Sequence, residues 1–189
     1  MSDEIYKIFE KSGALLTGHF QLTSGLHSPT YFQCAKVLQY PGYNTFLSKK
    51  IVDFVKSKKI DVVISPAVGG IVVGQEVGRQ LDVRTIFAER KDGIMKLRRG
   101  FELKKNEKVL ICEDVITTGG SVFEVIDLVK SEGADIIGVG VIVDRSGGSV
   151  KFSADQIALV QLKAETYSPD ECPLCKAGKP IQKPGSRKD

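Results

Sequence analysis

The chain has 189 residues, of which 42% are hydrophobic and 26% charged, and its formal net charge is +4. This length favours one α/β domain with modest additions, and the composition is that of a globular protein with a core of normal size. No apolar run is long enough to cross a bilayer, the first residues are too charged for a secretory signal, and the basic residues form no continuous face for a nucleic-acid duplex. We therefore expect a cytoplasmic protein with neither a membrane nor a nucleic acid as its partner.

The first part of the chain changes its pattern twice. Apolar residues at helical spacing predict a helix over residues 3–11. Residues 18–41 place turn residues between short β-prone pieces, which indicates a loop-rich segment with a hairpin-like path. Helical spacing then returns over residues 44–58.

A βαβ alternation follows. Apolar runs predict strands over 61–65, 85–89, 108–114 and 136–144, with helices over 70–81 and 121–132 between them. Near-continuous apolar strands separated by helices are typical of a mostly parallel sheet flanked by helices. Ligands gather at the carboxyl ends of such strands. That rule selects four segments: 65–70, 89–99, 113–121 and 144–148.

The segment after the third of these strands has the strongest chemical pattern. An apolar strand delivers Glu113 and Asp114 to its carboxyl edge, and a short loop of hydroxyl and glycine residues then opens a helix. A helix start offers unpaired N–H groups and a positive dipole end, which stabilise a phosphate monoester. The two carboxylates suit the hydroxyls of an attached ribose and the positive charge that develops on its ring. The pattern predicts a ribose 5-phosphate site, the alternative being an ordinary βα turn; its residues are Glu113, Asp114, Val115, Ile116, Thr117, Thr118, Gly119, Gly120 and Ser121.

The same stretch, from Val109 to Ser121, closely resembles the phosphoribosyl pyrophosphate motif of the type I phosphoribosyltransferase family. Residues 18–25 and 28–32 look like the N-terminal signature of its orotate phosphoribosyltransferases, and Asp144-Arg145 is also similar to that subfamily. The resemblance implies the type I phosphoribosyltransferase fold with a small N-terminal hood from residues 1–41. It also implies transfer of ribose 5-phosphate from phosphoribosyl pyrophosphate to orotate in pyrimidine (UMP) biosynthesis, with substrate-bound Mg²⁺, by a homodimer.

By this resemblance, Thr117 and Arg145 contact orotate, and Tyr31 and Phe32 line the base pocket. A planar guanidinium fits the carboxylate of orotate, and an aromatic ring supplies stacking area for the pyrimidine. Without the resemblance, a surface ion pair would be the first interpretation of Arg145, and core packing that of the two aromatic residues.

Residues 89–100 are strongly basic and follow a predicted strand. A flexible basic segment there would close over the pyrophosphate, exclude water and neutralise the leaving group. The family's mobile catalytic loop contains a Lys-x-His pair, but this chain has no histidine in the segment, so Arg90, Lys91 and Lys96 are the catalytic candidates. A charged hairpin is the alternative. The chain also departs from the family at Thr23, where a lysine is familiar, and at the turn of residues 68–70, where Tyr-Lys-Gly is familiar.

The end of the sequence, residues 168–189, is rich in Pro, Gly and Lys and is expected to be an irregular tail to a single domain over 1–167. Within it, Cys172 and Cys175 have the spacing of half a zinc knuckle. A structural zinc needs four ligands, and the sequence offers no second cysteine pair. We therefore expect no protein-bound metal. Two free thiols or an occasional disulfide are the main interpretation, and a site shared between two chains is the alternative.

Two rival functions share parts of this pattern. A transferase for a purine or for uracil would keep the phosphate site and differ at the base pocket. A nucleotide-sensing regulator on the same fold would need an added DNA-binding helix pair or a continuous basic face, and the residues before Gly18 are too few for such a domain.

Overall fold

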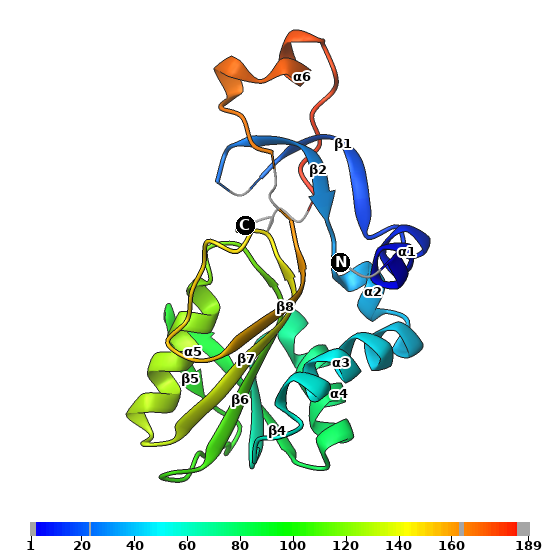
Figure 1. Ribbon diagram of the computed structural model, residues 1–189. Coiled ribbons are helices and arrows are strands. Elements are labelled where there is room, and N and C mark those ends of the chain that lie inside the picture. The colour runs from blue at the N-terminus through cyan, green and yellow to red at the C-terminus, as the bar shows by residue number, and fades with distance from the viewer. Residues whose placement is uncertain (1–2, 23, 163–164, 185–189) are drawn as a thin grey trace.

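The computed structural model describes residues 3–22, 24–162 and 165–184 (Figure 1). Its centre is a six-stranded sheet in the order β5-β4-β3-β6-β7-β8. Every neighbouring pair is parallel except β4 and β5, which are antiparallel. The predicted fold class, a mostly parallel sheet flanked by helices, is confirmed. The strands are β3 (Val62–Pro66), β4 (Arg84–Lys91), β5 (Ile94–Leu97), β6 (Lys108–Ile116), β7 (Asp135–Asp144) and β8 (Gln156–Gln161).

Helices cover both faces of this sheet. On one face lie α3 (Pro41–Val55) and α4 (Gly69–Leu81), and on the other lies α5 (Gly120–Ser131) (Figure 1). Side chains alternate along each strand, so Val63 packs with the first layer while Val62 and Ile64 pack with the second. Burial on both faces explains why these strands read as unbroken apolar runs in the sequence.

The N-terminal segment forms a small hood beside the carboxyl edge of the sheet (Figure 1). It consists of α1 (Asp3–Lys11), β1 (Leu15–Gln21), β2 (His27–Phe32) and α2 (Ala35–Leu38). The two strands pair in antiparallel register, with Leu15 opposite Phe32 and Gln21 opposite His27. The predicted helix and the hairpin-like path are both present. Phe9 of α1 packs edge-on against Phe32, with ring centroids 4.7 Å apart, and so ties the helix to the hairpin.

The segment after residue 165 differs from the predicted irregular tail. It contains a 3-10 helix, η1 (Pro169–Glu171), and the short helix α6 (Pro173–Lys176). Its backbone also pairs with the hood, since Tyr167 bridges to His27 and Gln182 bridges to Phe20. Elements this short leave no periodic pattern in the sequence. The segment adopts a regular structure because its backbone pairs with the open edges of the two-stranded hairpin. The strands β5 and β8 were likewise not predicted.

Among the residues described, no helix is both long enough and apolar enough to span a bilayer.

The contact between α3 and β7 gives a test of the layer packing. A Cβ at Gly140 on β7 would overlap the side chain of Ile51 on α3, whereas Gly42 at the start of α3 has open space around it. We expect Gly140→Ala to lower the free energy of unfolding by about 1–3 kcal/mol, because the helix must move off the sheet. For the matched variant Gly42→Ala, we expect the free energy of unfolding to stay the same or to rise by up to about 1 kcal/mol. Urea denaturation measures both, and equal shifts would contradict the packing described.

Candidate functional site

Three hollows adjoin one another at the carboxyl edge of the sheet. The smallest, of about 160 Å³, lies over the loop between β6 and α5. A second, of about 570 Å³, lies between this loop and the hood, and Thr117 and Thr118 line both of these hollows. A third, of about 580 Å³, reaches the turn before α4, and it shares Tyr31 and Arg145 with the second. The three hollows therefore share walls and lie next to one another at this edge.

The smallest hollow is built by the loop that the sequence selects for ribose 5-phosphate. All of the nine predicted residues except Asp114 line it. Gly119 ends the loop with φ of 77°, a left-handed conformation that favours glycine, and it precedes the first residue of α5. A Cβ at Gly119 would also press on Val150 and Phe152. The backbone N–H groups of the first turn of α5 are thereby presented to the hollow, which is the arrangement that binds a phosphate.

The two acids stand between this loop and the turn of residues 68–70. Glu113 is buried, and its Oε1 accepts the backbone N–H of Asp114 at 3.1 Å. Burial raises the pKa of the Glu113 carboxyl well above its ordinary value, and the charge of Asp114 raises it further. A Cβ at Gly70 would lie 2.8 Å from Glu113 Oε1, and one at Gly69 would overlap the Asp114 carboxylate. Because these two glycines have no side chain, the two carboxylates can lie against the backbone of the turn.

Arg90 is the basic candidate that the structure brings to this site. It lies on β4, and its guanidinium donates to both carboxylate oxygens of Glu124, at 3.0 and 2.9 Å. The same group donates to Ser121 Oγ at 3.1 Å. Hydrogen bonding to Glu124 raises the pKa of Arg90. A permanent positive charge is thus held at the wall of the smallest hollow, beside the amino end of α5.

The basic segment that contains Arg90 adopts the alternative structure, a charged hairpin. It is formed by β4 and β5, with Asp92 and Gly93 between them at φ of 54° and 77°. Two successive left-handed residues match the twist of a two-residue hairpin turn, which Asp-Gly favours. Arg99 closes the base of the hairpin with hydrogen bonds of 2.8 and 2.9 Å to Glu89.

The hairpin separates the other two candidates from Arg90. Arg90 is opposite Met95, which is buried, whereas Lys96 is opposite Glu89. Cross-strand partners share a face and successive residues alternate between faces. Lys91 and Lys96 therefore lie on the face away from Arg90, and neither lines the three hollows described. In this conformation the structure brings Arg90 alone of the three to the loop before α5.

The residues predicted for the base meet in the shared wall of the two larger hollows. The Arg145 guanidinium lies 5.5 Å from the centroid of the Tyr31 ring. The backbone N–H of Arg145 donates to the carbonyl of Ile116 at 2.9 Å, which ties it to the loop after β6. Burial lowers the pKa of Arg145. The adjacent Asp144 is fully buried and accepts backbone N–H groups of the following turn at 2.7 and 3.0 Å, so it holds the turn rather than a ligand.

Phe32 differs from its neighbour Tyr31. Side chains alternate along β2, so Tyr31 faces both larger hollows while Phe32 packs into the core against Phe9. Phe32 reaches only the wall of the third hollow. The core-packing interpretation therefore describes most of its contacts.

Several residues of the site lie outside the sequence predictions. Leu22, Ser24 and Thr166 complete the wall of the hollow beside the hood. The first two fall within the N-terminal signature, so their position in it was a usable signal, whereas Thr166 had none. Glu124 was missed because only the fold shows that the side of α5 with Ser121 and Glu124 faces Arg90 on β4. Thr23 lies outside the described residues.

We inferred from the sequence that the two cysteines of the C-terminal segment have no further metal ligands beside them, and the structure shows that this inference is wrong. Cys172 and Cys175 lie against His19 and His27, so the second pair exists and consists of histidines from the hood. Neither cysteine forms a disulfide in the structure. The histidine pair could not be recognised from the sequence, because the histidines and the cysteines are far apart along the chain.

Taken together, the sheet edge defines a class of protein with a phosphate-binding type of loop beside a pocket lined by an arginine. Residues 42–167 match the model of the phosphoribosyl transferase domain family. A relative from Chlorobium phaeobacteroides named orotate phosphoribosyltransferase is 61% identical over 95% of this chain and 93% of its own. One of the same name from Caldanaerobacter subterraneus is 55% identical over 98% of each.

A solved structure agrees in its fold. The orotate phosphoribosyltransferase of Aeropyrum pernix superposes with a TM-score of 0.73 at 22% identity, over 84% of this chain and 94% of that one. The chain belongs to the phosphoribosyltransferase family, and within it to the orotate phosphoribosyltransferases. The family predicted from the motifs is confirmed.

The buried acid gives a pH-dependent test of the site. The folded-state pKa of Glu113 is raised, so the folded protein holds this proton more tightly than the unfolded chain does. The resulting contribution to the free energy of unfolding is fully present at low pH. It is lost as pH rises from the unfolded pKa of about 4.3 through the folded value. The facing charges are Asp114, which raises this pKa further, and Arg90, which opposes the rise. We expect Glu113→Gln, with its permanently neutral amide, to become more stable than the wild type as pH increases, by about 1.4 kcal/mol for each unit of the pKa difference.

The control has the opposite sign. Hydrogen bonding to Arg79 lowers the pKa of Glu76 to about 2, so its contribution to stability is present at neutral pH and lost as pH falls. Glu76→Gln should therefore be less stable than the wild type at pH 7, with a difference that shrinks in acid. Denaturant unfolding across pH measures both variants, and a pH-independent difference for Glu113→Gln would contradict a raised pKa.

Proposed function

We propose that the protein is a pentosyltransferase that moves ribose 5-phosphate from phosphoribosyl pyrophosphate to orotate, giving orotidine 5′-phosphate and diphosphate in pyrimidine biosynthesis. The observation that carries this proposal is the position of Arg145 beside Tyr31, in a hollow that shares Thr117 and Thr118 with the phosphate loop. A base held by Arg145 would then adjoin a sugar whose phosphate lies at the start of α5. The names of the close relatives support the same acceptor.

Phosphoribosyl pyrophosphate would lie along the loop after β6. Its 5-phosphate would accept the backbone N–H groups of residues 118–121, and the ribose hydroxyls would donate to Glu113 and Asp114. The pyrophosphate would then lie toward the turn at Gly69 and Gly70, which packs directly against the carboxylates of Asp114 and Glu113. This order places the anomeric carbon between the acids and the hollow beneath the hood.

The reaction needs charge stabilisation rather than a covalent nucleophile. Positive charge develops on the ribose ring as the pyrophosphate leaves, and a carboxylate held near the ring stabilises it. Arg90 carries a positive charge at the wall of the smallest hollow and would neutralise the 5-phosphate, so that the substrate is held while the pyrophosphate leaves. Exclusion of water by the hood strengthens each of these interactions, because the local dielectric is low.

Mg²⁺ belongs to the proposal as a substrate-bound ion. It prefers oxygen ligands and binds phosphates with one or two carboxylates, and the half-buried Asp114 offers such a carboxylate at the wall of the third hollow. Bound there, the ion would neutralise charge on the pyrophosphate. The residues of the chain would align the substrate and hold its hydroxyls.

The acceptor specificity follows from one charge. Orotate differs from uracil by a carboxylate, and Arg145 would receive it with two parallel hydrogen bonds while Tyr31 lies beside the pyrimidine ring. A purine or uracil would leave the half-buried guanidinium without an anionic partner, which is costly. Arg145 thus favours orotate over the acceptors of the related transferases.

A homodimer in the cytoplasm completes the proposal. Its basis is the resemblance to the family, in which the active sites lie near the subunit interface. Light scattering of the purified protein measures the oligomeric state, and a mass of one chain at micromolar concentration would contradict the dimer.

An acceptor assay tests the activity. The purified protein with Mg²⁺ and phosphoribosyl pyrophosphate should consume orotate, and its kcat/KM for orotate should exceed those for uracil, adenine and guanine by at least about 100-fold, the worth of a charge-assisted pair of hydrogen bonds. Arg145→Ala should raise the KM for orotate and change that for phosphoribosyl pyrophosphate much less. Rapid consumption of a purine without consumption of orotate would reject the assigned acceptor.

The role of Arg90 can be tested by itself. Arg90→Ala removes the charge at the phosphate loop and should lower kcat/KM for phosphoribosyl pyrophosphate by about 10- to 150-fold, as expected for loss of a charged hydrogen bond. The matched variant is Arg79→Ala, which removes an exposed arginine paired with Glu76 on α4, away from the three hollows. It should leave the kinetics unchanged. Equal kinetics for the two variants would exclude Arg90 from catalysis.

A further inference from the structure

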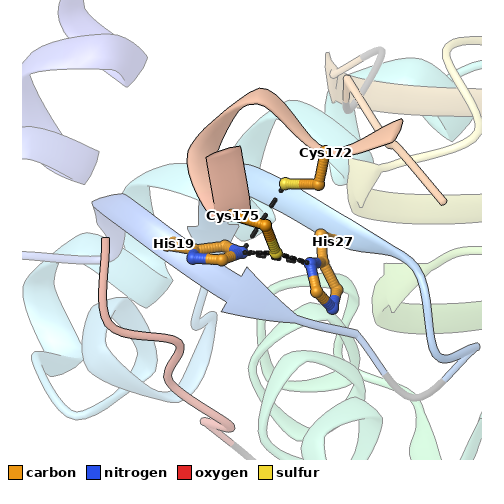
Figure 2. Close-up of side chains that lie close together, drawn as sticks. All are labelled: His19, His27, Cys172 and Cys175. Carbon is orange, nitrogen blue, oxygen red and sulfur yellow. Dashed lines mark hydrogen bonds between the residues drawn. The ribbon is translucent and has the colours of Figure 1, made fainter. Parts of the chain in front are cut away.

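Four side chains with metal-binding atoms converge outside the site described above. They are His19, His27, Cys172 and Cys175, and their ligand atoms all lie within 4.8 Å of one another (Figure 2). The hood supplies the two histidines, from β1 and from the start of β2, and the C-terminal segment supplies the two cysteines, from α6 and the residue before it. Figure 2 shows the two sulfur atoms and the two rings turned toward one another.

Four of the six separations between the ligand atoms are close to those of a tetrahedral coordination shell. His19 Nε2 lies 3.0 Å from His27 Nδ1 and 3.6 Å from Cys172 Sγ. Cys175 Sγ lies 3.7 Å from His19 Nε2 and 3.2 Å from His27 Nδ1. Zinc bonds of about 2.0–2.3 Å to nitrogen and sulfur place tetrahedral ligand atoms about 3.3–3.8 Å apart. All six separations are at most 4.8 Å, so the four atoms can close around one ion by small movements of their side chains.

The second nitrogen of His19 supports this interpretation. His19 Nδ1 lies 2.8 Å from the carbonyl oxygen of Lys179, which can only accept a hydrogen bond. The ring must therefore carry its proton on Nδ1, and the neutral ring then directs the lone pair of Nε2 at the cluster. Metal-binding histidines are oriented in this way, by a hydrogen bond from the other nitrogen.

We propose that these four residues bind a structural Zn²⁺ ion through His19 Nε2, His27 Nδ1 and the thiolates of Cys172 and Cys175. Two thiolates and two imidazoles are the donor set of closed structural zinc sites, and soft sulfur ligands disfavour Mg²⁺. Two thiolate charges also balance the charge of the ion. His19, His27 and Cys172 are buried, so three of the four ligands are withdrawn from water.

The ion fastens the C-terminal segment to the hood. Backbone pairing already joins the two at Tyr167 and at Gln182, which donates to the carbonyl of His19 at 2.8 Å. The segment also carries Thr166, which lines the hollow beneath the hood together with Leu22 and Ser24. The metal therefore stabilises the part of the hood that borders the proposed base pocket, while its own ligands lie outside the three hollows.

Metal content of the intact protein is the first measurement. Protein produced in zinc-supplemented cells and purified without chelators should contain one zinc ion per chain by plasma mass spectrometry. Cys172→Ser and Cys175→Ser should each lose most of this zinc. The matched variant Cys112→Ala removes a buried thiol of the sheet core and should retain it.

Cobalt gives a spectroscopic test that does not depend on the folding of any variant. Wild-type protein stripped of metal and titrated with Co²⁺ alone should develop the visible bands of a tetrahedral ion and a thiolate charge-transfer band, both saturating at one equivalent. Zinc should then displace the cobalt, because it is the preferred ion of such a site.

Cys175→His keeps four nitrogen and sulfur ligands and should still bind zinc.

Three results would overturn the proposal. They are wild-type protein that neither contains zinc nor takes up Co²⁺, serine variants that keep the full zinc content, or a disulfide between Cys172 and Cys175 in the purified protein. None of these measurements uses catalytic activity. Failure of the zinc site is therefore distinguishable from failure of the proposed transferase function.

Discussion

The carboxyl edge of the sheet depends on one close approach, between the backbone of Gly69 and Gly70 and the carboxylates of Glu113 and Asp114. β3 and β6 are neighbours in the sheet, so the turn that follows β3 lies against the two acids near the carboxyl end of β6. The two glycines have no side chain, and this leaves room for the two carboxylates. The cost of this arrangement is a carboxyl with a raised pKa, a perturbation that is common at catalytic sites.

Around this contact the chemistry is divided among neighbouring loops. The loop that ends at Gly119 presents backbone N–H groups to a phosphate, Arg90 supplies positive charge from β4, and Arg145 faces the hollow under the hood. Each of these groups is fixed by a structural partner: Glu124 holds Arg90, and the carbonyl of Ile116 holds the backbone of Arg145. Contacts within the chain thus fix the positions of these groups, which is the condition for electrostatic stabilisation of developing charge.

The sequence predicted the βαβ body well because strands buried on both faces leave unbroken apolar runs, as in residues 108–114. It selected the phosphate loop because an entire chemical pattern lies in nine consecutive residues. The hairpin of residues 89–100 was harder, since its basic side chains suggest a mobile loop while Asp92-Gly93 favours a tight turn, and only the pairing with β5 decides between them. The histidine–cysteine cluster could not be assembled from spacing, because its halves come from opposite ends of the sequence and meet only after the C-terminal segment folds back over the hood.

The docking of residues 165–184 on the hood has a consequence for how the protein is made. An isolated two-stranded hairpin is marginally stable in water, and β1 and β2 receive additional backbone partners at Tyr167 and Gln182. Ribosomes deliver the chain from its amino end, so the hairpin emerges first and these partners emerge only after β8. A nascent chain can therefore complete its parallel sheet while the cover over the arginine-lined hollow is still unfinished.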